Sequence, residues 1–126
     1  MAELSDYFEN AIIETMRATG ITAAAAYVAL YTSDPTDADT GTEVSGGSYA
    51  RQLAGLSVAS GGASSNAADI TFPTATASWG TVTHVGLRDA VTSGNLLMHS
   101  ILDASKTVGS GDTFKINAGD LDVTIA

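Results

Sequence analysis

The first twenty residues have the spacing of an amphipathic helix. Apolar or small side chains recur three and four residues apart, at Leu4, Phe8, Ala11, Ile12, Thr15 and Met16. Acidic side chains lie off this stripe, Arg17 lies near its end, and Gly20 follows where a helix-ending glycine is common. The pattern predicts one amphipathic helix of about four turns over residues 4–19.

After Gly20 the hydrophobic period changes from helical spacing to two. Tyr27, Ala29 and Tyr31 alternate with Val28 and Leu30, which predicts a strand with two distinct faces. Six further runs are β-like and are bounded by Gly, Asn, Asp or Ser: residues 49–59, 68–73, 80–90, 95–104, 112–117 and 120–126. Residues 90–95 and 117–120 have the composition of hairpin turns, and the second is short enough to fix a register.

Seven or eight short strands without intervening helices indicate an antiparallel sheet architecture. We therefore predict a mainly β protein, an antiparallel β-sandwich with one N-terminal amphipathic helix. The chain shows no linker and no internal repeat, so we expect a single domain, 1–126, with the helix at 4–19 and the sandwich at 22–126.

Composition and charge narrow the class of partner. Small residues dominate and only 6% are aromatic, which suits a thin core between two sheets. Fourteen acids against five scattered bases give a formal net charge of −9, which disfavours nucleic acid as a partner. No apolar run reaches membrane-spanning length and the N-terminus is acidic, so we expect a soluble protein with no membrane partner. The absence of cysteine removes thiolate chemistry and cysteine-type zinc sites.

The acidic loop, residues 34–47, is the densest group of candidate ligands. It holds four acids, Asp34, Asp37, Asp39 and Glu43. A calcium loop that starts at Asp37 would need a glycine at its sixth position and a glutamate at its twelfth, but Thr42 and Ser48 stand there. We interpret the loop as a solvated connector, with a weak cation site as the alternative.

Other residues with catalytic potential are isolated in the sequence. His84 and His99 each fall in a predicted strand without a nearby third metal ligand, and no serine nucleophile elbow is present. The G-x-G of residues 109–111 lacks the rest of a phosphate-binding loop and indicates a turn. We therefore predict no catalytic residue, no cofactor and no metal.

Three further residues carry two interpretations each. Arg51 and Arg88 lie in apolar runs, where a charge needs a partner, and pairing within the fold is favoured over ligand recognition. Trp79 is the lone tryptophan; it either fills the core or anchors an interface.

Residues 27–52, 68–90 and 94–125 together resemble a known family. The order of "ALYTSDPT", "YARQ", "FPTAT", "SWGTV", "GDTFKI" and "AGDL" is similar to that in short virion proteins of tailed bacteriophages. Members are described as tail-fibre-like, and some resemble head-decoration (cement) proteins with a jelly-roll-like body. The resemblance implies a non-enzymatic, jelly-roll-like β protein that packs against other virion subunits.

From this resemblance we expect a virion protein, made in the host cytoplasm, that decorates the head. It would bind the outer surface of the major capsid protein lattice as a homodimer or homotrimer and reinforce it. The alternative is a tail fibre or baseplate component that contacts tail proteins and serves host attachment. A small hydrolase or lectin-like module ranks last. The candidate subunit contacts are Phe8, Ile12 and Met16 on the helix, Trp79, and the loop residues Asp34, Asp37 and Asp39.

Overall fold

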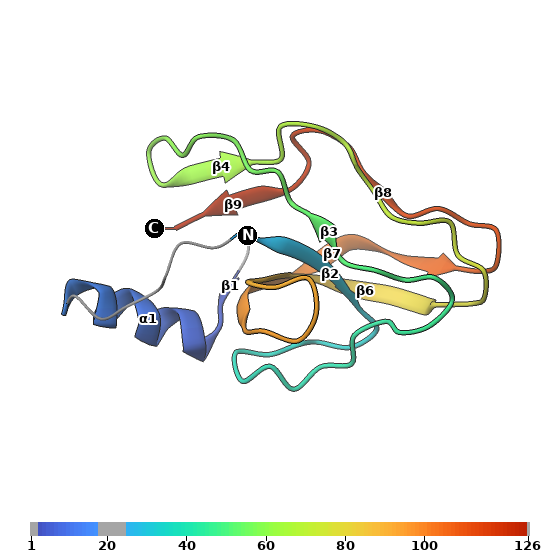
Figure 1. The fold of residues 1–126 in the computed structure, drawn as a ribbon, viewed down its shortest axis with the longest axis horizontal. Helices are drawn as coiled ribbons and strands as arrows, with labels where there is room; N and C mark the ends of the chain where they lie inside the picture. The colour runs from blue at the N-terminus through green and yellow to red at the C-terminus, as the bar shows by residue number, and fades with distance from the viewer. Residues whose placement is uncertain (1–2, 18–24, 126) are drawn as a thin grey trace.

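The computed structural model describes residues 3–17 and 25–125 and shows a mainly β fold with one short helix (Figure 1). In chain order the elements are β1 (Glu3–Leu4), α1 (Asp6–Met16), β2 (Tyr27–Tyr31), β3 (Gln52–Leu53), β4 (Ala63–Ser65), β5 (Ile70–Thr71), β6 (Gly80–Arg88), β7 (Leu96–Val108), β8 (Lys115–Ile116) and β9 (Asp122–Thr124). The predicted mainly β class with one helix near the N-terminus is confirmed.

The strands form one large antiparallel sheet and two small ones. The large sheet has the order β1-β7-β6-β2-β3, and the small sheets pair β4 with β9 and β5 with β8. In Figure 1 the small sheets lie along one side of the large sheet, giving a sandwich-like arrangement. The core lies between these layers and is centred on the contacting rings of Tyr49, Phe72, Trp79 and Phe114.

Strand β2 is buried on both of its faces. Val28 and Leu30 belong to the main core, whereas Ala29 and Tyr31 pack with Leu96 in a second cluster. The alternation predicted for this strand is therefore confirmed. Tyr31 lies so close to β6 that a Cβ on Gly86 would come within 2.8 Å of its ring, so the second cluster depends on a glycine there.

Helix α1 is shorter than predicted because Ser5 caps it. The Ser5 hydroxyl accepts a hydrogen bond from the backbone N–H of Phe8 at 3.2 Å and donates to the carbonyl of Leu96. Leu4 consequently pairs with Met98 in β1 instead of opening the helix. Arg17 ends the helix; the predicted residues 18 and 19 and the predicted stop at Gly20 lie outside the described residues.

The two predicted turns behave differently. Residues 90–95 do connect the hairpin of β6 and β7, with Asp89 N–H bonded to the Asn95 carbonyl at 3.1 Å. A turn also forms at 117–120, but the predicted hairpin is wrong, because β8 pairs with β5 and β9 pairs with β4. Buried Asn66 explains the difference: its side chain donates to the Asn117 carbonyl and accepts from Leu121 N–H, both at 2.9 Å, and so holds the turn apart from a simple hairpin.

The remaining strand predictions are partly wrong. The run 49–59 contributes only the two residues of β3, and β4 arises in a glycine- and serine-rich stretch that gave no strand signal. Both strands are short edge strands whose pairing partners are distant in the sequence, so local pattern does not determine them.

Candidate functional site

The acidic loop contacts two parts of the large sheet: Asp39 lies beside Tyr31 of the second cluster, through Arg88, and Val44 belongs to the main core. Pro35 is among the fully buried residues, and Val44 N–H donates to the Leu30 carbonyl at 2.9 Å as the chain returns to the sheet. A Cβ on Gly41 would lie 2.6 Å from Pro35 Cα, so the loop closes tightly on itself. Most residues of the loop are exposed, as expected of a solvated connector, but Pro35 and Val44 are buried.

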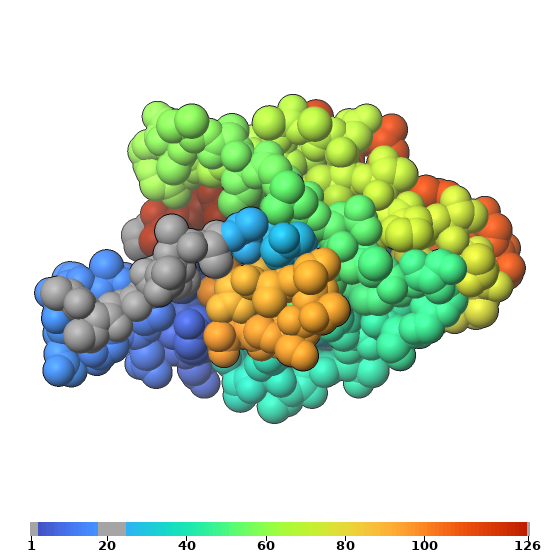
Figure 2. Space-filling model, in the orientation of Figure 1, coloured from blue at the N-terminus to red at the C-terminus, as the bar shows by residue number. Residues whose placement is uncertain are grey.

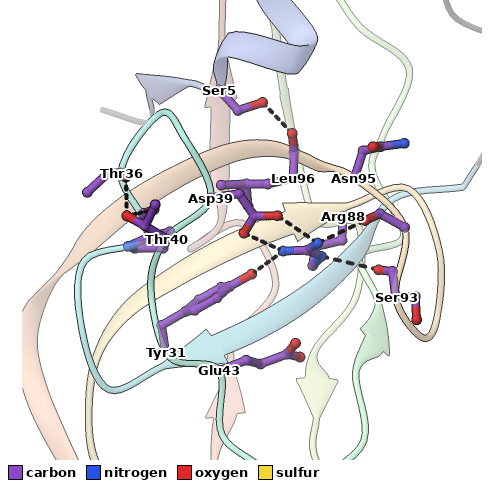
Figure 3. A network of polar contacts seen from close by, with 12 residues as sticks. Ser5, Tyr31, Thr36, Asp39, Thr40, Glu43, Arg88, Ser93, Asn95 and Leu96 are labelled. Carbon is purple, nitrogen blue, oxygen red and sulfur yellow. Dashed lines mark hydrogen bonds and ion pairs between the residues drawn. The ribbon is translucent and has the colours of Figure 1, made fainter.

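Asp39 anchors the loop to the sheet through Arg88 (Figure 3). The guanidinium donates to both carboxylate oxygens, at 2.8 and 2.9 Å, and to the Tyr31 hydroxyl at 2.9 Å. It also donates to the carbonyls of Ser93 and Gly94, so it joins the loop to the β6–β7 turn. Burial lowers the pKa of Arg88, but the bonds to Asp39 and Tyr31 outweigh that effect and raise the pKa above its ordinary value. The cation that the Asp39 carboxylate binds is therefore the guanidinium group of Arg88.

Glu43 forms a second anchor with Arg51. The guanidinium donates to the two carboxylate oxygens at 2.7 and 2.8 Å, and the Tyr49 hydroxyl donates at 2.6 Å. Arg51 also donates to the carbonyls of Ala90 and Ser93. Burial raises the pKa of Glu43, but the bonds from Arg51 and Tyr49 outweigh it and leave the pKa below its ordinary value.

The two arginines therefore tie the same pair of segments together. Each binds an acid of the acidic loop and a carbonyl of the turn between β6 and β7, and in Figure 2 these segments lie against each other. Pairing of Arg51 and Arg88 within the fold, as predicted, is what the geometry shows. The sequence did not reveal that both partners come from the acidic loop.

Asp37 joins the loop to the N-terminal segment. Its carboxylate contacts His99 Nε2 at 2.8 Å, and its backbone carbonyl accepts from Asp6 N–H at 2.9 Å. Glu3 Oε2 lies 3.7 Å from His99 Nδ1, and Asp34 Oδ1 lies 3.9 Å from the same nitrogen. Two of the surfaces proposed from sequence, the helix and the acidic loop, thus meet at the start of α1.

The candidate contact residues of the helix divide into inner and outer positions. Phe8 is half-buried and packs against the main core, Ile12 is half-buried, and Met16 is 80% exposed. The predicted stripe therefore faces the body of the protein in its first half. Of these three residues, Met16 offers the most surface to a partner.

Trp79 occupies the core. Its side chain is 4% exposed, and its indole N–H donates to the Gly47 carbonyl at 2.9 Å. Because almost none of the ring reaches the surface, Trp79 fills the core, the first of its two interpretations, and offers little area for a subunit contact. The side chains of Asp34, Asp37 and Asp39 are 59%, 52% and 36% exposed, although Asp37 and Asp39 already bind residues of the sheet.

The described part of the chain places no serine hydroxyl against a histidine nitrogen. His84 Nδ1 shares a hydrogen bond with the neighbouring Thr83 hydroxyl at 2.8 Å, and His99 bonds Asp37. The Asp39 and Glu43 carboxylates are held by guanidinium groups, so their oxygens are already engaged within the fold. These contacts connect segments of the fold to one another.

Within residues 3–17 and 25–125, no helix has the length and apolar content needed to cross a membrane.

A cleft of about 430 Å³ opens between β7 and the segment that carries β8 and β9. It lies where β7 bulges between two of its pairings with β6, Lys106 with Val82 and Ile101 with His84. Apolar side chains such as Leu102 and Val123 line it together with exposed charged residues. The cleft marks the place where the two layers diverge.

Comparison with known proteins identifies the family. The sequence profile of the family described as "Podophage GP4 fiber I protein gp80" matches residues 3–124. The chain belongs to this podophage fibre family. The match extends from β1 to the end of β9, so it includes the helix, both arginine anchors and the core. A comparison of this fibre-family chain with curated proteins gives no match.

Proposed function

We propose that the protein is a structural subunit of a phage fibre and works by contact with other virion proteins. The observation that carries the proposal is the match to a fibre family over nearly the whole chain. The two arginine anchors support the proposal, because the Arg51–Glu43 and Arg88–Asp39 pairs hold the acidic loop on the sheet and so have a structural role. Of the two locations considered from sequence, this match favours the fibre alternative over head decoration.

We further propose that α1 is the attachment element. Figure 1 shows the helix projecting from one end of the sheets, fastened at its start and extending away from the body. Ile13 and Met16, three residues apart and so on one side of the helix, are 53% and 80% exposed; Tyr7, on the other side, is 41% exposed. Neighbouring exposed apolar side chains such as Ile13 and Met16 are typical of a surface that a partner covers.

The partner of that surface is, in this proposal, a tail or fibre protein of the same particle. A homodimer or homotrimer would present two or three helices at once, and the linked sites would raise the effective concentration of the second contact after the first had formed. A modest area on each helix would then suffice for stable attachment.

Immunogold electron microscopy of purified particles tests the location. An antibody raised against the folded domain should label fibres at the tail, and quantitative mass spectrometry should find a small multiple of three or six copies per particle. Label spread over the head together with several hundred copies would overturn the fibre proposal and restore head decoration. Absence from washed particles would overturn both.

A further inference from the structure

His99 lies in a setting that the sequence did not indicate. Its side chain is 3% exposed, yet three carboxylates from other segments surround its ring. Asp37 is 62 residues away in the chain and bonds Nε2 at 2.8 Å, while Glu3 and Asp34 face Nδ1. These three acids are distant from His99 in the sequence, which is why no metal ligands were expected beside it. In the folded protein they lie next to its ring.

The two ring nitrogens have different surroundings. Asp37 lies at hydrogen-bond distance from Nε2, so the other ring nitrogen, Nδ1, is the one that faces Glu3 and Asp34. Nδ1 has no hydrogen-bond partner among the described residues; its neighbours Glu3 Oε2 and Asp34 Oδ1 stand at 3.7 and 3.9 Å. Among the described residues, every fully buried side-chain nitrogen or oxygen has a hydrogen-bond partner. Since Nδ1 has none, it is not fully buried and keeps some access to solvent.

The distances from Nδ1, 3.7 Å to Glu3 and 3.9 Å to Asp34, lie at and just beyond the upper end of the spacing of two ligands around one ion. Imidazole and carboxylate ligands bind zinc at about 2.0–2.2 Å, so two ligands of one zinc stand roughly 3.0–3.7 Å apart. One candidate ligand atom from each of Glu3, Asp37 and His99 lies within 4.8 Å of the other two; Asp37 reaches this group beside the ring nitrogen Nε2. Glu3 and Asp34 are largely exposed, with side chains at 72% and 59%, so small rotations can bring their oxygens to bonding distance.

We propose that His99, Glu3 and the acids of this corner bind a divalent transition-metal ion of the zinc class. Nδ1 of His99 and the Glu3 carboxylate are the first ligands, Asp34 is within reach as a third, and Asp37 orients the ring through Nε2. A carboxylate that holds the far nitrogen of a ligating histidine is a recurrent feature of zinc sites. Imidazole among the ligands favours this class over Ca²⁺ or Mg²⁺.

The bound ion would join three segments at one point. Glu3 belongs to β1, Asp34 and Asp37 to the acidic loop, and His99 to β7. Since α1 begins directly after β1, the ion would fix the base of the helix on the sheet. This is a property of the domain itself and does not depend on where in the virion it is located.

Isothermal titration calorimetry of the full chain without a histidine tag tests the site, with ZnCl₂ as the probe and CaCl₂ as comparator. We expect one Zn²⁺ per chain, little heat from Ca²⁺, and a melting temperature that rises by about 5 °C at saturating zinc and returns with EDTA. His99→Gln should abolish binding, whereas His84→Gln, the matched control at the other histidine, should bind as the unsubstituted chain does.

Glu3→Gln keeps the test decisive even if His99→Gln does not fold, because the Glu3 side chain is exposed and its loss leaves the core intact. We expect that substitution to weaken zinc binding at least tenfold with an unchanged circular dichroism spectrum. Binding that does not saturate, that is equally strong for Ca²⁺, or that His84→Gln weakens as much as His99→Gln would overturn the proposal.

Discussion

Arg88 and Asp39 form a two-bond ion pair across 49 residues of sequence, with bond lengths of 2.8 and 2.9 Å. The pair holds the acidic loop on the outer face of the sheet, above Tyr31 and Leu96 (Figure 3). Because the Arg88 side chain is 9% exposed, its charge is stable there only while a partner is present.

Removing the charge of Asp39 should therefore destabilise the domain. We expect Asp39→Asn to lower the free energy of unfolding by about 2 kcal/mol, since a buried guanidinium loses its counter-charge. Urea denaturation followed by circular dichroism measures it. Glu14→Gln is the matched control, because the Glu14–Arg17 pair is exposed and such pairs contribute about 0.5 kcal/mol or less. Equal effects of the two substitutions would contradict the anchoring role of Asp39.

Glu43 should make the stability of the domain sensitive to acid. Its pKa in the folded protein lies below the ordinary value of 4.5, so the folded state binds its proton less readily than the unfolded state. The stabilisation is fully present above pH 4.5 and is lost as the pH falls through the folded-state pKa. Melting temperatures between pH 7 and pH 3 should fall most steeply below 4.5.

Glu43→Gln tests the assignment of this acid effect. The variant should be less stable at neutral pH and should show a shallower fall in acid, because it has no proton to bind at this position. Glu9→Gln, an exposed helix substitution, should leave the profile unchanged. A Glu43→Gln profile parallel to that of the unsubstituted protein would show that other carboxylates determine the acid response.

Gly86 should tolerate no side chain. An added Cβ would lie 2.8 Å from Tyr31 Cε1 and 2.9 Å from Leu96 Cδ1, so Gly86→Ala forces the second cluster apart. We expect a loss of about 1–3 kcal/mol in the free energy of unfolding. Gly109→Ala is the control, because its nearest neighbour would be 3.5 Å away. Chemical denaturation of both variants should show a large loss for the first and little change for the second.

The outer side of α1 should contribute to attachment and not to folding. Ile13 and Met16 are 53% and 80% exposed, so Ile13→Asp with Met16→Asp should leave the melting temperature within about 2 °C of the unsubstituted value. Incorporation into particles should fall at least tenfold, measured by mass spectrometry after complementation. Val58→Asp, at a 94% exposed apolar residue of the body, is the matched control and should incorporate normally. Normal incorporation of the helix variant would contradict the role of α1.

Some of the fold follows directly from local sequence. The alternation in residues 27–31 correctly assigned the two faces of β2, and the turn residues at 90–95 correctly located the β6–β7 hairpin. Both depend on neighbouring residues alone: side-chain period in a strand, and positive φ angles at Ser93 and Gly94 in a turn. The helix was located but overextended, because the capping role of Ser5 was not recognised.

The site depended on contacts that sequence spacing does not contain. The sequence contained a usable signal, two arginines in apolar runs and four acids in one loop, but nothing local matched Arg88 to Asp39 or Arg51 to Glu43. The contact between His99 and Asp37 is equally absent from local sequence. So is the hydrogen bond from Asn66 to the 117–120 turn, where a hairpin was predicted. In each case a buried polar group selected a partner from a distant segment.

The inward orientation of Arg51 and Arg88 has a consequence for how copies meet. With these two guanidiniums enclosed, the bases left on the outside are Arg17, Lys106 and Lys115, among many exposed carboxylates. Neighbouring molecules therefore repel one another in dilute buffer, and lateral packing requires either a cationic face on the partner or enough electrolyte to screen the repulsion. In the homo-oligomer proposed above, ionic strength would therefore control assembly, because the burial of two cations leaves the surface negative.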